Sequence, residues 1–372
     1  MKVAANAFDR MWSENGPDIL AAIDAVGTSG WYVLGQAVAR FEDTLAARCG
    51  VAHAVGCGNG MDALELSLRA AGIGDGDLVL TTPLSAFATG LAILRAGAQP
   101  VYADVDANGL LDPACVETAL AQYPDIRAII PVHLYGHLAD TPRLAELASA
   151  HGAVLIEDAA QAIGARRGAT AMGQYGLTSC LSFYPTKNLG TVGDGGALVT
   201  ASPEIADLTR SLRNYGQTQR YVHDHVGMNS RLDELHAAIL VDALLPRLDD
   251  WTARRRGIAG RYLAEIRNPA IALVPGPDPD GSVWHLFPVL VAPDQRADFM
   301  AYLADAGVQA GQHYPILIPD QKAMTDHGTP MVAGPLTRAR TFAEGEVSLP
   351  IQPFLTEDEV SYVIAIANAW AS

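Results

Sequence analysis

Short apolar runs alternate with helical patterns through the first two-thirds of the chain, and this alternation constrains the fold most strongly. Strands are expected at residues 52–58, 78–82, 100–105, 127–132, 153–158, 180–184 and 196–200. Between the earlier runs, segments such as 62–72 and 142–152 carry apolar residues at helical spacing. This alternation predicts an α/β fold, with a mainly parallel sheet between helices. The last two runs are linked by a short glycine-rich stretch, which predicts an antiparallel pair within the sheet.

The pattern changes after about residue 250. Residues 251–266 form one long helical pattern, and a turn-rich stretch, an apolar strand and further helices follow. The last helix is expected to begin near Thr356. We therefore predict a large domain over residues 1–250 and a smaller α+β domain over residues 251–372.

Composition restricts the partners. Hydrophobic residues make up 49% of the 372 positions, which is typical of a globular, soluble protein. The net charge of −16 would repel phosphate backbones, so nucleic acid is not an expected partner. The four cysteines lie far apart without a C-x-x-C pair, which argues against a zinc cluster and fits a reducing compartment. With no apolar signal core or membrane-length run apparent, a cytoplasmic location is expected.

A glycine-rich turn joins an expected strand to an expected helix at residues 55–64, VGCGNGMDAL. Glycines there allow close backbone approach, and the helix N-terminus offers free N–H groups, so the turn suits a phosphate. A purely steric need for glycine explains this stretch equally well. The segment also resembles the dinucleotide-binding pattern G-x-G-x-x-G. If the pattern starts at Gly56, Met61 stands where the last glycine should be. If it starts at Gly58, Ala63 stands there, and alanine is an allowed variant. This segment alone therefore does not exclude a nicotinamide cofactor.

The expected strand at 153–158 ends in two carboxylates, Glu157 and Asp158. Ligands of open α/β sheets bind at the carboxyl ends of strands. An ionised aspartate there could hold a heteroaromatic nitrogen in its protonated form. Capping of a following helix is the alternative. Only one of the two acids could cap well, so the pair favours a functional role.

A single lysine, Lys187, stands in SFYPTKNLGTVGDGGALVT, residues 182–200. A lysine amine forms a Schiff base with a carbonyl once its pKa is lowered. Taken alone, Lys187 is more simply explained as a solvated loop residue. Together with Asp158 and the glycine-rich turn, however, it supplies the parts that a pyridoxal phosphate (PLP) enzyme needs, and Ser182 could add a hydroxyl to the phosphate site.

Over nearly its whole length the chain resembles the nucleotide-sugar aminotransferases of the aspartate-aminotransferase (fold type I) group. EDAAQA and SFYPTKNLG are the most specific shared motifs. The matching segments, in the expected order, are GWYVLG (30–35), FED (41–43), GNGMDALELSLRAAGIGDGD (58–77), PVYADVD (100–106), PVHLYGH (131–137), EDAAQAIGA (157–165), SFYPTKNLGTVGDGGALVT (182–200), RNYGQ (213–217), GMNSRLDELHAAIL (227–240) and HYP (313–315).

The resemblance implies PLP as the cofactor and a role for each matching residue. Lys187 would form the Schiff base with PLP and then move a proton during the reaction. Asp158 would pair with the pyridine nitrogen, and Gln161 would lie beside the ring hydroxyl. The phosphate would be held by the backbone of Gly60 and Met61, by the Ser182 hydroxyl, and by Asn229 of the neighbouring subunit. The last of these contacts implies a homodimer with shared active sites.

The resemblance also places residues near the substrate. His313 and Tyr314 would approach the sugar, as would Tyr215 and Arg231, although for His313 a packing role between domains is nearly as well supported. The aromatic that commonly stacks on the PLP ring in this family falls at Ala86, with Phe87 beside it. Either Phe87 takes that place or a smaller residue covers the ring.

The predicted function is PLP-dependent amino transfer from L-glutamate to a nucleotide-linked keto-sugar. A dTDP-3-keto-6-deoxyhexose is the favoured substrate, and the alternative is a 4-keto sugar carried by UDP, GDP or dTDP. Sugar deoxygenation ranks lower, because relatives with that chemistry carry histidine where this chain has Lys187. A nicotinamide-dependent oxidoreductase would give Lys187 and Asp158 no role. A regulator without catalytic activity would not need the complete set of catalytic positions.

Overall fold

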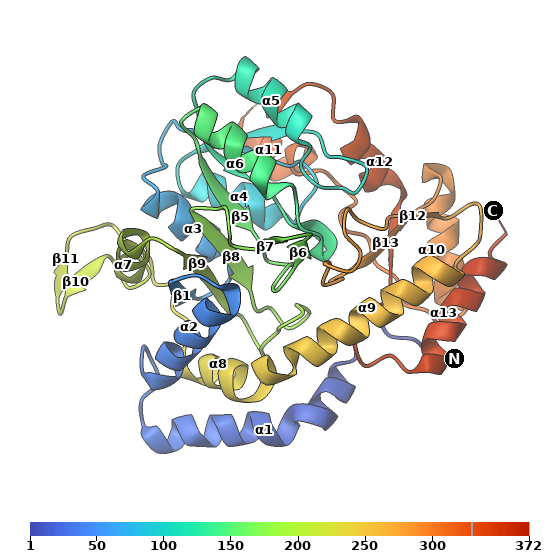
Figure 1. Ribbon diagram of the computed structural model, residues 1–372, viewed down its shortest axis with the longest axis horizontal. Helices are drawn as coiled ribbons and strands as arrows, with labels where there is room; N and C mark the ends of the chain where they lie inside the picture. The colour runs from blue at the N-terminus through green and yellow to red at the C-terminus, as the bar shows by residue number, and fades with distance from the viewer. Residues whose placement is uncertain (329, 372) are drawn as a thin grey trace.

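The computed structural model describes residues 1–328 and 330–371 and is built around an eight-stranded sheet of order β1-β9-β8-β5-β4-β2-β3-β14 (Figure 1). The strands are β1 (His53–Cys57), β2 (Leu78–Thr81), β3 (Gln99–Ala103), β4 (Ile126–Ile130), β5 (Val154–Asp158), β8 (Thr178–Ser182), β9 (Gly196–Thr200) and β14 (Met331–Ala333). Strand β9 is antiparallel to both neighbours, whereas the other adjacent pairs are parallel. The α/β fold and the antiparallel pair predicted from the sequence are therefore confirmed.

Helices cover both faces of this sheet, because alternate side chains of each strand enter different apolar clusters. Val55 and Cys57 of β1 join α3, α4 and α7 on one face, whereas Ala54 joins α1, α2 and α8 on the other. Helices α5, α6 and α12 continue that second face over β2, β3 and β4. These helices are α1 (Phe8–Ser29), α2 (Gln36–Cys49), α3 (Gly60–Ala70), α4 (Phe87–Arg95), α5 (Pro113–Gln122), α6 (Thr141–Ala150), α7 (Pro203–Leu212), α8 (Glu234–Ala238) and α12 (Thr337–Gly345).

A second, antiparallel sheet of order β12-β13-β15 lies in the C-terminal part of the chain (Figure 1). Its own apolar cluster includes side chains of α9, α10 and α13. The elements are β12 (Ala272–Leu273), β13 (Phe287–Leu290), β15 (Glu346–Leu349), α9 (Leu248–Glu265), α10 (Arg296–Asp305) and α13 (Glu357–Ala369). The boundary at residue 250 stays a prediction. Strand β14 lies beyond it and pairs with β3 of the large sheet, and Val3 pairs with Val308.

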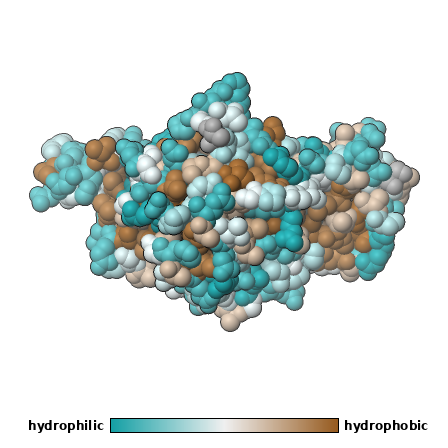
Figure 2. All heavy atoms as spheres, turned by 90° about the horizontal axis from the view of Figure 1, so that it is seen from above, coloured by the Kyte–Doolittle hydropathy of each residue, from teal (hydrophilic) through white to brown (hydrophobic). Residues whose placement is uncertain are grey.

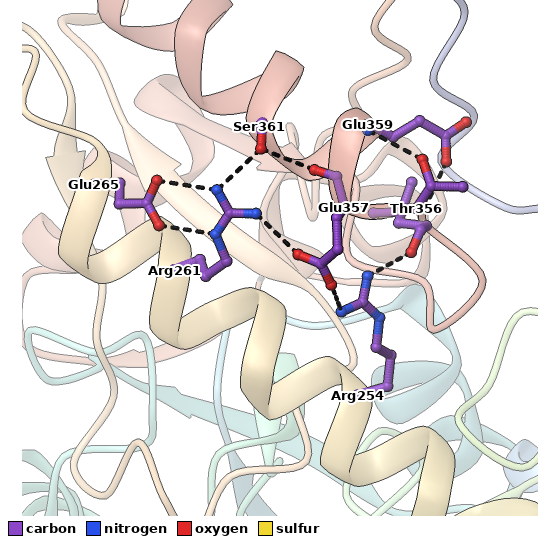
Figure 3. A network of polar contacts seen from close by, with 8 residues as sticks. Arg254, Arg261, Glu265, Thr356, Glu357, Glu359 and Ser361 are labelled. Atoms are coloured by element: carbon purple, nitrogen blue, oxygen red, sulfur yellow. Dashed lines mark hydrogen bonds and ion pairs between the residues drawn. The ribbon is translucent and has the colours of Figure 1, made fainter.

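Ion pairs tie α9 to α13 along their exposed sides (Figure 3). Arg261 binds Glu265 on its own helix at 2.8 Å and Glu357 of α13 at 3.0 Å, and Arg254 pairs with Glu357 as well. Thr356 caps α13 where its start was expected, through a reciprocal capping box with Glu359. Exposed pairs contribute about 0–1 kcal/mol each, so the shared apolar cluster is the main link between the two helices.

A two-stranded hairpin, β10 (Gln217–Gln219) and β11 (Val222–His223), projects from the body at the left of Figure 1, far from both termini. Figure 2 shows this projection with apolar residues among polar ones. Tyr221 and Val226 are 80% and 87% exposed in the single chain. The remaining short elements are β6 (Arg166–Arg167), β7 (Thr170–Ala171), η1 (Leu134–Gly136), η2 (Ile239–Leu244), η3 (Leu245–Arg247), η4 (Pro293–Gln295), η5 (Ile318–Asp320) and α11 (Lys322–His327). Among the helices of the described residues, none is both long and apolar enough to cross a bilayer.

Candidate active site

Three strand ends meet at one edge of the large sheet. Strands β1, β8 and β5 run in the same direction, because β9 between β1 and β8 is antiparallel to both. Strand β1 leads into the glycine-rich turn, β8 ends at Ser182, and β5 ends at Asp158. The loop that carries Lys187 follows β8 directly. The topology therefore gathers the three sequence motifs at the edge where open α/β sheets bind ligands.

Asp158 is buried at this edge, with 5% of its surface exposed. Its Oδ2 accepts a 2.9 Å hydrogen bond from the Thr89 hydroxyl, and its Oδ1 accepts one of 3.2 Å from the Ala160 N–H. Burial raises the pKa of Asp158, while these hydrogen bonds and the charge of Lys187 oppose the rise. Thr89 was not identified from the sequence, although it lies only two residues after Phe87, which was considered for stacking on the ring.

Glu157 points to the opposite face of the sheet, as strand alternation requires. Its carboxylate accepts hydrogen bonds from His133 Nε2 at 2.9 Å, Gly173 N–H at 3.1 Å and Gly176 N–H at 2.8 Å. Burial raises the pKa of Glu157, but these partners outweigh that effect and leave the pKa lowered. The two acids are thus separated, and their pairing in sequence gives no support for a function of Glu157 at this edge.

Lys187 lies close enough to Asp158 for the two charges to interact. Burial lowers the pKa of the Lys187 amine to about 8, and the carboxylate of Asp158 opposes this shift. A buried amine with a lowered pKa is a better nucleophile at neutral pH than a solvated lysine. The alternative of a solvated loop lysine is therefore not supported.

The glycine-rich turn touches the end of β8. A Cβ added to Gly60 would lie 2.8 Å from Ser182 Cβ, and one added to Gly196 would lie 2.3 Å from the Asn59 carbonyl carbon. Only glycine permits both approaches. The amides of Gly60 and Met61 belong to the first turn of α3, which leaves its N–H groups without helical partners. The structure thus brings together Gly60, Met61 and Ser182, the residues predicted to hold a phosphate.

Side chains fix the shape of this turn. Asn59 caps α3 by accepting a 2.9 Å hydrogen bond from the Asp62 N–H. The Ser230 hydroxyl accepts from Gly58 N–H at 2.9 Å and donates to Asp62 at 2.7 Å. These contacts hold the turn against the segment that contains Asn229.

A hydrogen-bond chain links Gln161 to the HYP segment. Gln161 Oε1 accepts from the Tyr135 N–H at 2.7 Å, and its Nε2 donates to the Tyr314 hydroxyl at 3.3 Å. The Tyr135 hydroxyl donates to the His313 carbonyl at 2.8 Å. Burial, together with the nearby charge of Lys187, lowers the pKa of His313 to about 4, so this histidine is neutral near pH 7. Tyr135 was not singled out from the sequence, although it lies within the PVHLYGH motif.

Comparison with known proteins gives the family. Residues 14–368 match the DegT/DnrJ/EryC1/StrS aminotransferase family. The chain belongs to this family. The chain is 44% identical over 356 residues, 95% of each chain, to the erythromycin biosynthesis sensory transduction protein EryC1 of Saccharopolyspora erythraea.

Two further relatives are similarly close. The dTDP-3-amino-3,4,6-trideoxy-alpha-D-glucose transaminase of Streptomyces venezuelae is 44% identical, covering 94% of this chain and 91% of the relative. The crystal structure of S. venezuelae DesV in complex with a ketimine intermediate superposes with a TM-score of 0.93 at 41% identity, covering 99% of this chain and 98% of DesV. The resemblance seen in the sequence is confirmed, and the protein is a PLP-dependent aminotransferase.

The residues at this edge of the aminotransferase fit PLP. The half-buried Lys187 and the buried carboxylate of Asp158 lie near each other, and the Gly60–Ser182 contact forms a backbone cradle too narrow for a side chain. PLP supplies an aldehyde that takes up an amino group and a ring that withdraws electrons. Asp158 would hold a proton on the ring nitrogen, the cradle would hold the phosphate, and Lys187 would bind the aldehyde.

Phe87 is turned away from this role in the aminotransferase. Its side chain packs against the cluster of Tyr102, Ile318 and Met324. Ala86, the position matched to the family's stacking aromatic, lies half-buried just before α4. Of the two alternatives left by the sequence, cover of the ring by a smaller residue fits this packing.

Tyr215, Arg231 and Asn229 form a separate group at the base of the projecting hairpin. The Arg231 guanidinium lies 5.1 Å from the centre of the Tyr215 ring and donates to Asn214 Oδ1 at 2.7 Å. Asn214 pairs through its backbone with Asn229, whose side chain is exposed. Within the described part of the single chain, no hydrogen bond joins this group to Lys187 or His313.

Proposed function

We propose that this aminotransferase moves the amino group of L-glutamate to the keto carbon of a dTDP-linked 3-keto-6-deoxyhexose. The observation that carries the proposal is the meeting of Lys187, Asp158 and the Gly60–Ser182 cradle at one sheet edge. The dTDP-sugar transaminase name of the 44% identical relative supports the substrate class. That name also favours a dTDP-linked 3-keto sugar over the 4-keto alternative.

Each residue at the site has a distinct task in this proposal. With a pKa of about 8, Lys187 both takes up and returns a proton near neutral pH. Asp158 keeps the ring nitrogen protonated, and Gln161 lies beside the ring. His313 and Tyr314, which the hydrogen-bond chain joins to Gln161, face the sugar. Burial of Asp158 and Gln161 strengthens the charge interactions at the site.

The direct test is a transamination assay with PLP, L-glutamate and a panel of dTDP-, UDP- and GDP-linked 3-keto and 4-keto sugars. We expect turnover with the dTDP-linked 3-keto sugar and an absorbance band of the bound cofactor at roughly 410–430 nm. Lys187→Ala should lose both. Lys322→Ala, at a lysine whose side chain is 86% exposed, is the matched control and should retain both. A protein that stays colourless with PLP would contradict the proposal.

We further propose a homodimer in the cytoplasm, in which Asn229 of one chain reaches the phosphate held by its partner. The exposure of Asn229, Tyr215 and the projecting hairpin in the single chain supports this arrangement. Mixing Lys187→Ala chains with Asn229→Ala chains tests it, because a mixed dimer would contain one site with both residues intact. Regained activity is expected on mixing, and a mixture as inactive as its components would contradict shared sites.

A further inference from the structure

Strand β15 carries a buried acid that no step of the proposed reaction uses. Glu346 is 1% exposed, and its Oε2 accepts a 2.6 Å hydrogen bond from the His313 N–H. Its Oε1 shares a short hydrogen bond with the Ser348 hydroxyl. The same hydroxyl lies 2.9 Å from His313 Nδ1. Glu346, Ser348 and His313 therefore form one continuous chain of hydrogen bonds.

The backbone builds this relay. Glu346 and Ser348 are two residues apart in a strand, so both side chains point to one face, while Val347 and Leu349 enter the apolar cluster on the other. Ser348 also pairs with Gly311 through backbone hydrogen bonds of 2.9 and 3.1 Å. That pairing brings His313, two residues beyond Gly311, over the polar face of β15.

A cavity lies beside the ring of His313. The cavity has a volume of about 120 Å³ and is lined by His313, Ser348 and Thr186, the neighbour of Lys187. Within the described part of the chain, His313 Nε2 has no hydrogen-bond partner. Because His313 is neutral near pH 7, only one of its ring nitrogens carries a proton, and the relay at Nδ1 decides which one.

We propose that Glu346, acting through the Ser348 hydroxyl, places the proton of His313 on Nε2 and so makes this nitrogen a hydrogen-bond donor toward a substrate oxygen. The substrate-facing role of His313 rests on the proposed function; the relay itself does not. A protonated Glu346 donates to Ser348 Oγ, the hydroxyl donates to Nδ1, and the proton of the ring then sits on Nε2. An ionised Glu346 accepts from Ser348, Oγ then accepts from Nδ1–H, and Nε2 becomes an acceptor.

Burial of Glu346 favours the first state near pH 7. Burial raises the pKa of Glu346 to about 8, against the hydrogen bonds from Ser348 and His313 and the positive charge of Arg296 of α10. Tyr135 and Tyr314 also face it. Burial and then the charge of Glu346 raise the pKa of Tyr135, and burial and the charges of Asp158 and Glu346 raise the pKa of Tyr314. His313 Nε2 is thus a donor at neutral pH and an acceptor at alkaline pH.

Nitrogen NMR of histidine-labelled holoenzyme tests the relay, because the two tautomers have different ring shifts. The His313 signal, assigned by its loss in His313→Gln, should show Nε2–H at pH 7 and Nδ1–H at pH 9. Glu346→Gln should hold Nε2–H at both pH values, since its amide donates to Ser348 but does not ionise. Ser348→Ala should remove the switch, and Ser348→Thr should keep it.

The readout distinguishes the two proposals. A wild-type His313 with the same tautomer at both pH values would overturn the relay, as would a switch that persists in Glu346→Gln. These results do not depend on turnover, so inactivity toward every keto-sugar would overturn the proposed function and leave the relay standing. If both proposals are correct, kcat/KM for the keto-sugar should fall less between pH 7 and pH 9 in Glu346→Gln than in the wild type.

Discussion

Thr89 donates a 2.9 Å hydrogen bond to the buried carboxylate of Asp158. The two residues come from the first turn of α4 and the end of β5, and both are buried. Because a hydroxyl donor favours the ionised carboxylate, Thr89 opposes the effect of burial on the pKa of Asp158. The ionised state of Asp158, which we propose to hold the ring nitrogen of PLP, thus depends on a residue sixty-nine positions away.

Replacing Thr89 should weaken cofactor binding. Thr89→Val keeps the side-chain shape and removes the donor, so the pKa of Asp158 should rise and its charged form should become less stable. A hydrogen bond to a charged group contributes about 1.5–3 kcal/mol, which corresponds to a PLP affinity lower by roughly tenfold or more. Titration of the apoenzyme with PLP measures this, with Thr89→Ser as the matched control. Equal affinities in wild type and Thr89→Val would contradict the assigned role.

The reactivity of Lys187 should follow pH with a midpoint near 8. Only the neutral amine reacts, and burial lowers its pKa to about 8 in the cofactor-free protein. The charge of Asp158 raises that pKa, so Asp158→Asn should move the midpoint to lower pH. Labelling with trinitrobenzenesulfonate over a pH series, read by mass spectrometry of the peptide, measures both values. Exposed Lys322 serves as the internal reference, and a midpoint that Asp158→Asn leaves in place would count against a charge interaction between Lys187 and Asp158.

Substitutions of the adjacent acids Glu157 and Asp158 should have different effects, one on stability and the other on catalysis. Glu157→Gln disturbs a buried site with His133 and two backbone amides, so it should lower the free energy of unfolding by about 2–4 kcal/mol. Asp158→Asn should instead reduce kcat by about a hundredfold or more at nearly unchanged stability. Urea unfolding and steady-state kinetics on both variants separate the two effects. Equal losses of stability in the two variants would contradict the prediction that Glu157 stabilises the fold and Asp158 acts in catalysis.

Glu346 should make the protein less stable as the pH rises from about 5 to 8. Its pKa is raised from 4.5 to about 8 on folding, so the folded state binds the extra proton in that range. The contribution of Glu346 to the free energy of unfolding is complete below pH 4.5 and is lost as the pH passes 8. The free energy of unfolding changes by a few kcal/mol at most over this range. Urea unfolding of the wild type and Glu346→Gln at several pH values measures the slope. The slope should be flatter in the variant, and parallel slopes would disprove the shift.

The sequence alone determined the architecture and the central chemistry of this aminotransferase. Alternation of apolar runs with helical patterns predicted seven of the eight strands of the large sheet to within two residues, because short β-rich runs and amphipathic helices are local signals. Lys187, Asp158 and the glycine-rich turn were found for the same reason, since each sits in a short motif with its own chemical logic.

Tertiary structure decided what those motifs contact. It placed Glu157 and Asp158 on opposite faces, packed Phe87 against Ile318, and brought Thr89 to Asp158. It also added β14 to the large sheet and set Glu346 and Ser348 beneath His313. These relationships join residues far apart in the chain, and they arise from strand pairing and burial. No local pattern encodes them, because the pKa and the partner of a side chain depend on which distant segments exclude water from it.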